Sequence, residues 1–171
     1  MVTRYLPTFN QIEPENLLGL TAGLVVAQQP VKYTPASEDT SGDEPVVTPE
    51  SYGVTSVEKS GIKFFENGIL CSLNNKGEII DYAGSGALFI HFTEELNTVL
   101  VDRKYFAVEA NQDETFLRLV ALVPGSIWTT NVEAADAAAY AAAKTAGKIA
   151  VLNDSVTLPD GRPAKTYICI A

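Results

Sequence analysis

Short apolar runs alternate with turn residues along the last two-thirds of the chain. They are IKFF, GILCSL, EIIDY, ALFIHF, TVLV, KYFAVEA, FLRLVALV, SIWTT, KIAVL, SVTL and KTYICIA. Runs of this length, rich in Val, Ile, Phe, Tyr and Leu and nearly evenly spaced, are typical of an all-β sandwich or barrel. We therefore expect residues 55–171 to form a mainly β domain of short, largely antiparallel strands.

Three turn motifs between these runs have a clear physical basis. Asn67-Gly68 suits a tight reversal because both residue types tolerate a positive φ. Asn75-Lys76-Gly77 ends the next run in the same way. Pro159-Asp160-Gly161 lies between SVTL and KTYICIA and predicts a hairpin at the C-terminal end of the domain.

One segment has the composition of a helix. The stretch TTNVEAADAAAYAAAKTAGK is nearly all alanine in its interior, and alanine is the best helix former. Thr130 and Glu133 have the spacing of a capping box, and Gly147 supplies a left-handed stop. These signals predict one Ala-rich α-helix over about residues 131–146. Its one large side chain, Tyr140, is either a subunit contact or part of a lid over one end of the β domain.

The first 54 residues divide into two zones. Residues 1–35 mix turn formers with the run GLTAGLVVA, which contains Gly19 and Gly23 and is better read as a strand or an extended arm than as a helix. Residues 36–54 are acidic and rich in Ser, Thr, Gly and Pro, with no basic residue between Lys32 and Lys59. Such a segment buries too little apolar surface to offset its ordering entropy, so we expect an acidic, flexible loop or linker.

The N-terminal zone carries candidate interface residues. Arg4, Tyr5, Leu6 and Phe9 combine apolar and cationic anchoring, which favours contact with another surface. Two readings stay open: an arm that reaches a neighbouring subunit, or a strand that completes the domain's own sheet.

Charge, hydropathy and cysteine content narrow the partners. Asp and Glu number 21 against 12 Lys and Arg, a formal net charge of −9 with no basic cluster, so we expect no nucleic-acid partner. No apolar run approaches the roughly 20 residues that span a bilayer, and the N-terminus lacks a signal-peptide pattern. We expect no membrane association and a soluble protein made in a cytoplasm. Cys71 and Cys169 lie in apolar runs and are expected to be buried reduced thiols.

His91 is the only histidine, and Glu94 follows it by three residues, a spacing that metal enzymes use. In ALFIHF, however, strand alternation places His91 on one face, and Glu94 and Glu95 belong to the following turn. A zinc site needs three or four ligands, and there is no second histidine or cysteine pair. Motifs for nucleophilic catalysis, phosphate binding and dinucleotide binding are also missing. We expect a structural or surface role for His91, no metal, no cofactor and no enzymatic activity.

The stretches ENGILCSLNNKGEI, FIHFTEELNT, KYFAVEA and RLVALVPGSIWTTNV, spread over residues 63–132, carry a resemblance. Their style is an Asn-Gly strand pair, a strand with a charged end, and an apolar strand that runs into a Gly-x-x-x-Thr-Thr-Asn turn. Together they resemble the small structural proteins of tailed-bacteriophage heads, including capsid decoration and head-fibre base proteins. The acidic segment and the Ala-rich helix lie outside this pattern.

The resemblance implies a virion protein, made in the host cytoplasm, that binds the outside of an assembled capsid and reinforces it. Its implied partners are a major capsid protein, copies of itself as a trimer, and other head or fibre proteins. The alternative is a carbohydrate- or receptor-binding module of a fibre, which would need exposed aromatic side chains on one sheet face. The candidates for such a platform are Trp128, Tyr52, Tyr82 and Tyr105.

Overall fold

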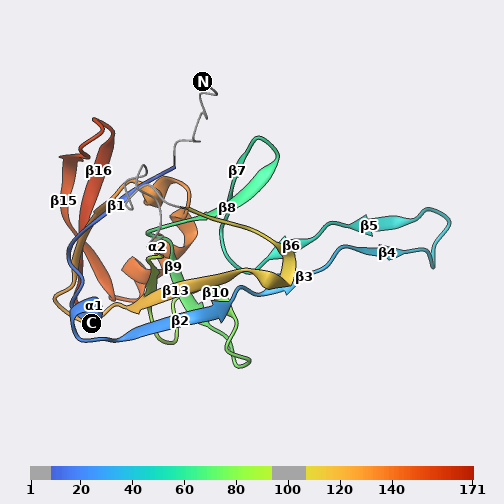
Figure 1. Cartoon of the computed structure of the whole chain (residues 1–171), viewed down its shortest axis with the longest axis horizontal. Coiled ribbons are helices and arrows are strands. Elements are labelled where there is room, and N and C mark those ends of the chain that lie inside the picture. The colour runs from blue at the N-terminus through green and yellow to red at the C-terminus, as the bar shows by residue number, and fades with distance from the viewer. Residues whose placement is uncertain (1–8, 94–106) are drawn as a thin grey trace, which may run out of the picture.

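The protein is mainly β, as the alternation of apolar runs predicted. The computed structural model describes residues 9–93 and 107–171, and in these ranges every named strand pairing is antiparallel. Two larger sheets pack on a shared core, which is consistent with a sandwich, and one helix of more than two turns lies against them (Figure 1). The fold class and the single Ala-rich helix are confirmed.

The four-stranded sheet joins the two ends of the described chain. Its order is β1-β14-β16-β15, so the N-terminal strand lies at one edge and the C-terminal hairpin at the other. Its strands are β1 (Ile12–Asn16), β14 (Ile127–Thr130), β15 (Ile149–Thr157) and β16 (Pro163–Cys169). Both edge strands carry register shifts, at which the ladder is locally disrupted.

The five-stranded sheet has the order β10-β9-β11-β13-β2. Its edge strand β2 also comes from the N-terminal zone, and pairs with β13 from Phe116↔Pro30 to Val120↔Val25. The strands are β2 (Val25–Pro30), β9 (Leu70–Leu73), β10 (Ile79–Asp81), β11 (Phe89–His91) and β13 (Phe116–Ala121). With β1 and β2 placed in the two larger sheets, residues 12–30 belong to the folded body.

Three smaller sheets complete the described fold. A three-stranded sheet has the order β12-β8-β7, and two two-stranded ladders pair β3 with β6 and β4 with β5. Their strands are β7 (Val57–Lys59), β8 (Ile62–Glu66), β12 (Ala107–Glu109), β3 (Tyr33–Thr34), β6 (Ser51–Tyr52), β4 (Ser37–Asp39) and β5 (Val46–Thr48). Short 3-10 turns η2 (Gln112–Glu114) and η3 (Val132–Ala134) precede β13 and the long helix.

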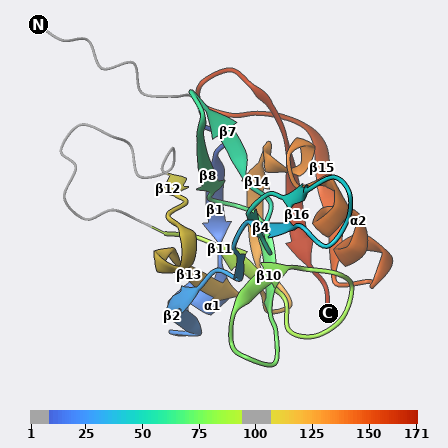
Figure 2. The same cartoon turned by 90° about the vertical axis from the view of Figure 1, so that its right-hand side faces the viewer.

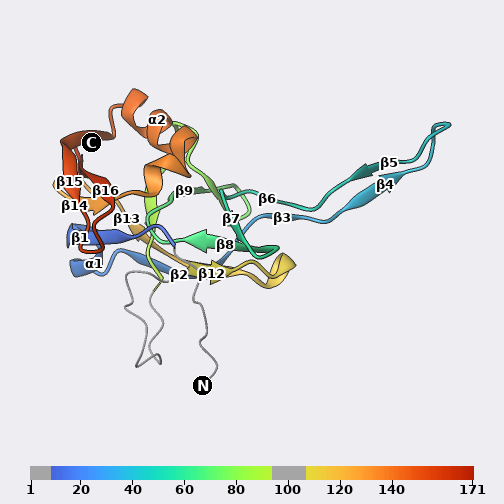
Figure 3. The ribbon, with the colours of Figure 1, turned by 90° about the horizontal axis from the view of Figure 1, so that it is seen from above.

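The core draws on both larger sheets and on the helix α2 (Ala137–Thr145). Trp128 and Tyr167 of the four-stranded sheet stack with ring centroids 5.7 Å apart, and Tyr140 of α2 packs on Tyr167 at 4.9 Å. Figure 3 shows α2 on one side of β9, with β2 and β12 on the other. Cys71 and Cys169 are free and buried, as expected, because each sits on an inward position of a central strand.

The N-terminal run GLTAGLVVA differs from its prediction in its first half. Leu18–Thr21 form the one-turn helix α1, and the chain becomes extended only in β2. Gly19 permits this packing, because a Cβ there would lie 2.1 Å from the carbonyl oxygen of Ala121 on β13. The helix therefore depends on a close approach to the sheet that only glycine allows.

The start of α2 also differs from its prediction, whereas its end agrees. Thr130 does not cap the helix: its hydroxyl donates to the carbonyl of Gln11 and accepts from the amide of Val132, and the N-cap residue is Asp136. The predicted capping box is therefore wrong. At the other end Gly147 has φ +67°, and the amide of Lys148 donates to the carbonyl of Ala143, the pattern of a left-handed helix stop.

Two of the three predicted turns close hairpins. Gly77 lies in the β9–β10 hairpin and Gly161 in the β15–β16 hairpin, both at positive φ. Gly68 also has a positive φ of 99°, but Asn67-Gly68 does not close a hairpin. Its flanking strands β8 and β9 lie in different sheets, so the turn is a crossover between layers.

Candidate functional site

The most exposed feature of the described chain is the acidic segment that the sequence predicted as a loop or linker. Residues 37–39 and 46–48 instead pair as an antiparallel hairpin, with Ser37↔Thr48, Glu38↔Val47 and Asp39↔Val46 in register. The β4–β5 hairpin extends away from the sheets in Figures 1 and 3. Every residue from 34 to 49 is exposed. The hairpin is therefore held as a ribbon that does not contribute to the core.

The base of this hairpin is tightly clamped to the body. Tyr33 of β3 and Tyr52 of β6 face each other with ring centroids 5.3 Å apart. Tyr52 also meets the Phe65 ring edge-on at 5.4 Å, and its hydroxyl accepts a hydrogen bond of 3.0 Å from the amide of Gln112. The Lys63 ammonium lies 5.7 Å from the centre of the Tyr52 ring, within the range of a cation–π contact.

A backbone clasp lies next to the tyrosines. The amide of Gly53 donates to the carbonyl of Lys32, and the carbonyl of Gly53 accepts from the amide of Asp81. A Cβ at position 53 would lie 2.9 Å from the Cβ of Lys32 and 3.1 Å from Cγ2 of Ile80. The backbone segments around Lys32 and Gly53 thus approach more closely than a residue larger than glycine would permit. The fold fixes where the hairpin leaves the body.

The distal part of the hairpin, residues 38–48, has four carboxylates and two exposed valines. Glu38, Asp39, Asp43 and Glu44 are all exposed, and no Lys or Arg lies among them. Val46 and Val47 are 63% and 65% exposed. At the tip the amide of Ser41 donates to Oδ1 of Asp39, and these hydrogen bonds with Ser41 lower the pKa of the Asp39 carboxyl. Asp39 is therefore charged near neutral pH.

His91, the histidine that the sequence singled out, has a structural role. It lies on β11, is fully buried, and both ring nitrogens have partners. Nδ1 is 2.8 Å from the carbonyl oxygen of Glu66, so this nitrogen carries the proton and donates. Nε2 then accepts from the hydroxyl of Thr93 at 2.7 Å. Burial lowers the pKa of His91 to about 4, and the ring is neutral at physiological pH. Glu94 and Glu95 lie outside the described residues.

The crossover at Glu66-Asn67 holds three distant parts of the chain together. The Glu66 carboxylate accepts from the amide and side chain of Asn10, and its backbone pairs with Ala107. The side chain of Asn67 exchanges two hydrogen bonds with the backbone of Thr93, at 2.8 and 3.1 Å. Three segments that are distant in sequence, at Asn10, Thr93 and Ala107, therefore meet at one dipeptide.

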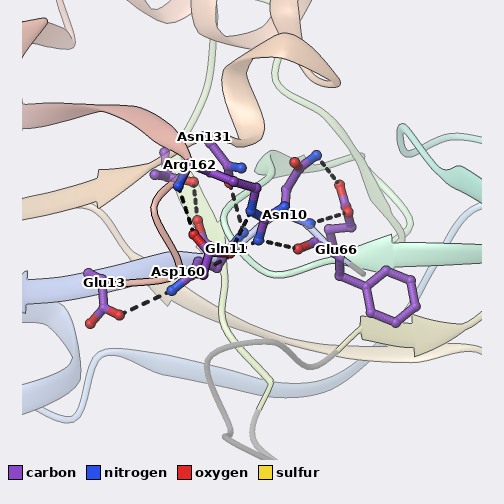
Figure 4. Close-up of polar contacts among 9 residues, drawn as sticks. Asn10, Gln11, Glu13, Glu66, Asn131, Asp160 and Arg162 are labelled. Atoms are coloured by element: carbon purple, nitrogen blue, oxygen red, sulfur yellow. Dashed lines mark hydrogen bonds and ion pairs between the residues drawn. The ribbon is translucent and has the colours of Figure 1, made fainter. Parts of the chain in front are cut away.

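The start of the described chain is docked by a polar network, shown in Figure 4. The guanidinium of Arg162 donates to the carbonyl of Phe9 at 2.7 Å, and the amide of Gln11 donates to the side chain of Asn131 at 2.8 Å. The Phe9 ring lies against that of Phe64, with centroids 4.9 Å apart. Phe9 is therefore committed to its own chain, and its prediction as an interface residue is not supported by its contacts. Arg4, Tyr5 and Leu6 lie outside the described residues.

Tyr140 is also a core residue, which corrects its prediction as an interface contact. It is fully buried, and its hydroxyl donates to the carbonyl of Gly68 at 2.8 Å and accepts from the indole NH of Trp128 at 3.3 Å. The helix α2 thus covers its own sheets with its one large side chain. Trp128 and Tyr82 are buried too, so neither can serve as a sugar platform, and Tyr105 lies outside the described residues.

The carboxyl group of Asp136, the N-cap residue of α2, has a displaced pKa. Asp136 is buried, and although Oδ2 accepts from the amide of Leu70 at 2.8 Å, Oδ1 has no hydrogen-bond partner. Burial is the main cause that raises the pKa of Asp136 to about 8, and the charge of Asp81 adds to it. Asp136 thus holds a proton at neutral pH, but its burial denies it to a substrate.

A shallow cavity of about 410 Å³ lies beside η3 and the β15–β16 hairpin, and Glu133 lines it. Lys144, Lys165 and Tyr167 all bond to Glu133. Burial alone would raise the pKa of Glu133, but these bonds outweigh it and hold the pKa at about 2. The ionised carboxylate of Glu133 therefore joins α2 to β16 through three polar contacts. Because it is ionised, it is poorly suited to act as an acid.

Within residues 9–93 and 107–171 we find no group of three or more His, Cys, Asp or Glu placed to hold a metal ion. The same part of the chain contains no helix with the length and hydropathy needed to cross a bilayer.

Comparison of the whole chain with protein-family models, with curated proteins and with solved structures finds no match. The clamped hairpin is the most prominent candidate site of the described residues.

Proposed function

We propose that this protein is a structural component of a virus particle that binds the outside of an assembled capsid and reinforces it. The observation that carries the proposal is the β4–β5 hairpin. Sixteen consecutive exposed residues, 34–49, project from a base whose direction is fixed by the tilted contact of the Tyr33 and Tyr52 rings and by the backbone hydrogen bonds of Gly53. The ribbon adds nothing to the core of its own chain, yet its base fixes its direction. It is therefore suited to contact another molecule.

The phage-head resemblance of residues 63–132 supports a particle as the setting. Reinforcement by shape needs a rigid body, and buried hydrogen bonds hold the elements of this body together. His91 of β11 bonds to Glu66 of β8, and Tyr140 and Asp136 join α2 to Gly68 and Leu70. The outer strands of the larger sheets are short or carry register shifts, which limits edge-to-edge aggregation at high local concentration. Under this proposal the partners are a major capsid protein and neighbouring head proteins.

Co-sedimentation with phage heads assembled in the absence of this chain tests the proposal. The purified protein should pellet with the heads, and electron microscopy should place it on the outer surface. The N-terminal contribution is tested by deleting residues 1–8 alone, because a longer deletion removes β1 and β2 from the sheets. A protein that stays in the supernatant with every head preparation, and instead binds glycans on an array, would overturn the proposal in favour of a receptor-binding module.

A further inference from the structure

We infer that the β4–β5 hairpin inserts into a slot on a neighbouring protein, so that both faces of the hairpin are covered. The two walls of this slot carry cationic side chains and apolar contact points. This inference rests on the proposed function, since it names the surface that an assembly partner would offer. It is carried by the register of the ribbon, by the exposure of its two valines, and by its charge.

The register assigns one valine to each face. Side chains alternate between the faces of a strand, and directly paired residues point to the same face. Val47 therefore shares a face with Glu38, and Val46 shares the opposite face with Asp39. A ribbon that lay flat on a partner would bury one valine and leave the other in water. Each face of the ribbon thus carries one valine beside one carboxylate. Two such faces match a slot whose two walls are similar to each other.

The backbone of the ribbon points to the same geometry. In the described chain β4 pairs only with β5, so the outer edge of each strand offers unpaired amide and carbonyl groups. Exposed edges of this kind are templates for pairing with another strand. Within the described ribbon, Oδ1 of Asp39 accepts a hydrogen bond from the amide of Ser41, whereas the side chains of Glu38, Val46 and Val47 are exposed and available to a partner.

The charge identifies the kind of partner. The hairpin adds four carboxylates and no cation, and the whole chain has a net charge of −9. A second copy of this chain would therefore repel the ribbon, whereas Lys and Arg at the walls of a slot would attract it. The partner is thus a different, locally basic protein. The clamped base lowers the ordering cost of binding, because the ribbon already has a fixed direction.

Head-binding measurements on substituted proteins test the two-sided slot. Val46→Ser and Val47→Ser should each weaken binding roughly five- to twentyfold, because each removes one buried apolar contact. Val151→Ser, at a valine that is 39% exposed on β15, is the matched control and should leave binding unchanged. If only one hairpin valine matters, the ribbon lies flat and the slot is wrong. If neither matters while the unsubstituted protein binds, the hairpin is not the docking element.

The variant E38Q/D39N/D43N/E44Q tests the role of the hairpin carboxylates. It should bind heads more weakly than the unsubstituted protein at low salt, and its affinity should change much less as salt is raised, because the screened attraction has been removed. The control removes the same number of exposed carboxylates from the body: E58Q/E109Q/D113N/D154N. Equal behaviour of the two variants would overturn the inference. So would self-association of the unsubstituted protein in sedimentation velocity that the hairpin variant abolishes, since the partner would then be a second copy.

A second measurement does not depend on heads. An alternating Lys-Val peptide is titrated into the full chain and followed by NMR, with an all-Lys peptide of equal charge as the comparison. The inference predicts that amide shifts concentrate at residues 37–48 and are larger with the Lys-Val peptide. Shifts spread over the carboxylates of the body would overturn it. If the unsubstituted protein fails to pellet with any head, the proposed function is wrong, and this titration alone decides the chemistry of the hairpin.

Discussion

His91 and Asp136 are buried titratable side chains whose displaced pKa values act on stability in opposite directions. The pKa of His91 falls from 6.5 to about 4, so between these values the unfolded chain binds more protons and stability rises with pH. The pKa of Asp136 rises from 3.8 to about 8, so in that window the folded chain binds more protons and stability falls as pH rises. Each slope is about 1.4 kcal/mol per pH unit.

The two slopes predict a characteristic pH profile. Between about pH 4 and 6.5 they largely cancel, and between 6.5 and 8 the free energy of unfolding should fall by about 2 kcal/mol because, of these two groups, Asp136 alone still titrates. Asp136→Asn should remove that decline and leave a rise from pH 4 to 6.5. His91→Gln should leave a decline across the whole range. Urea unfolding of the three proteins at several pH values provides the measurement, and a flat profile for all of them would contradict both assignments.

Elements were predictable where their signals are local. The β15–β16 hairpin follows from Pro159-Asp160-Gly161, and the end of α2 follows from Gly147, because a turn or helix stop depends on the backbone preferences of a few neighbouring residues. The Asn67-Gly68 motif correctly predicted a positive φ at Gly68, but it did not predict which strands pair on either side of the turn. Whether β8 and β9 pair with each other or with distant strands depends on long-range packing, which no local motif encodes.

The candidate site was missed at the element scale for a different reason. The composition of residues 36–54 shows that little surface can be buried there, and the structure agrees, since residues 34–49 are exposed. A segment that buries little surface can still be held at its base. Tyr33 and Tyr52 bracket the segment and meet each other, and Val46-Val47-Thr48 is a β-favouring run opposite residues 37–39. Those two features were the available signal.

The role of Tyr140 could not be decided from the helix sequence. Alanine surrounds it on every side, so α2 has no apolar stripe that tells the core-facing side from an outer one. Its burial comes from contacts with Gly68 and Trp128, which lie in other elements.

Gly147 gives a test of the helix end. Gly147→Ala should lower the free energy of unfolding by about 1–2 kcal/mol, because φ of +67° is unfavourable for a residue with a Cβ. Gly42→Ala is a matched exposed control, where a Cβ would be 3.7 Å from its nearest heavy atom, and its effect should stay within about 0.5 kcal/mol. Thermal unfolding followed by circular dichroism measures both. Equal destabilisation would show that the left-handed stop does not matter.

For the whole molecule, the hairpin and the body should be energetically separable. Replacing residues 36–49 by a Gly-Gly turn removes only exposed residues and keeps the pairing of Tyr33 with Tyr52. The melting temperature should therefore change by no more than about 4 °C, which corresponds to about 1 kcal/mol or less. Differential scanning calorimetry tests this. A drop of more than about 10 °C would mean that the ribbon supports the sheets and is not simply displayed by them.

The same separation makes the deletion a clean probe of binding, because a loss of head attachment would not follow from a damaged body. Figure 2, which looks along the hairpin, shows β15, β16 and α2 on one side and β2, β12 and β13 on the other.

The docking of β1 onto β14 has a consequence for biosynthesis. The hydroxyl of Thr130 donates to the carbonyl of Gln11 across 119 positions of sequence. A ribosome that adds about 5–20 amino acids per second makes the first strand many seconds before its partner leaves the exit tunnel. During that interval the nascent N-terminal segment has no native ladder to join. Completion of the four-stranded sheet must therefore wait until β14 and β16 have been synthesised, and a chaperone that shields β1 would act during the interval in which this strand has no partner.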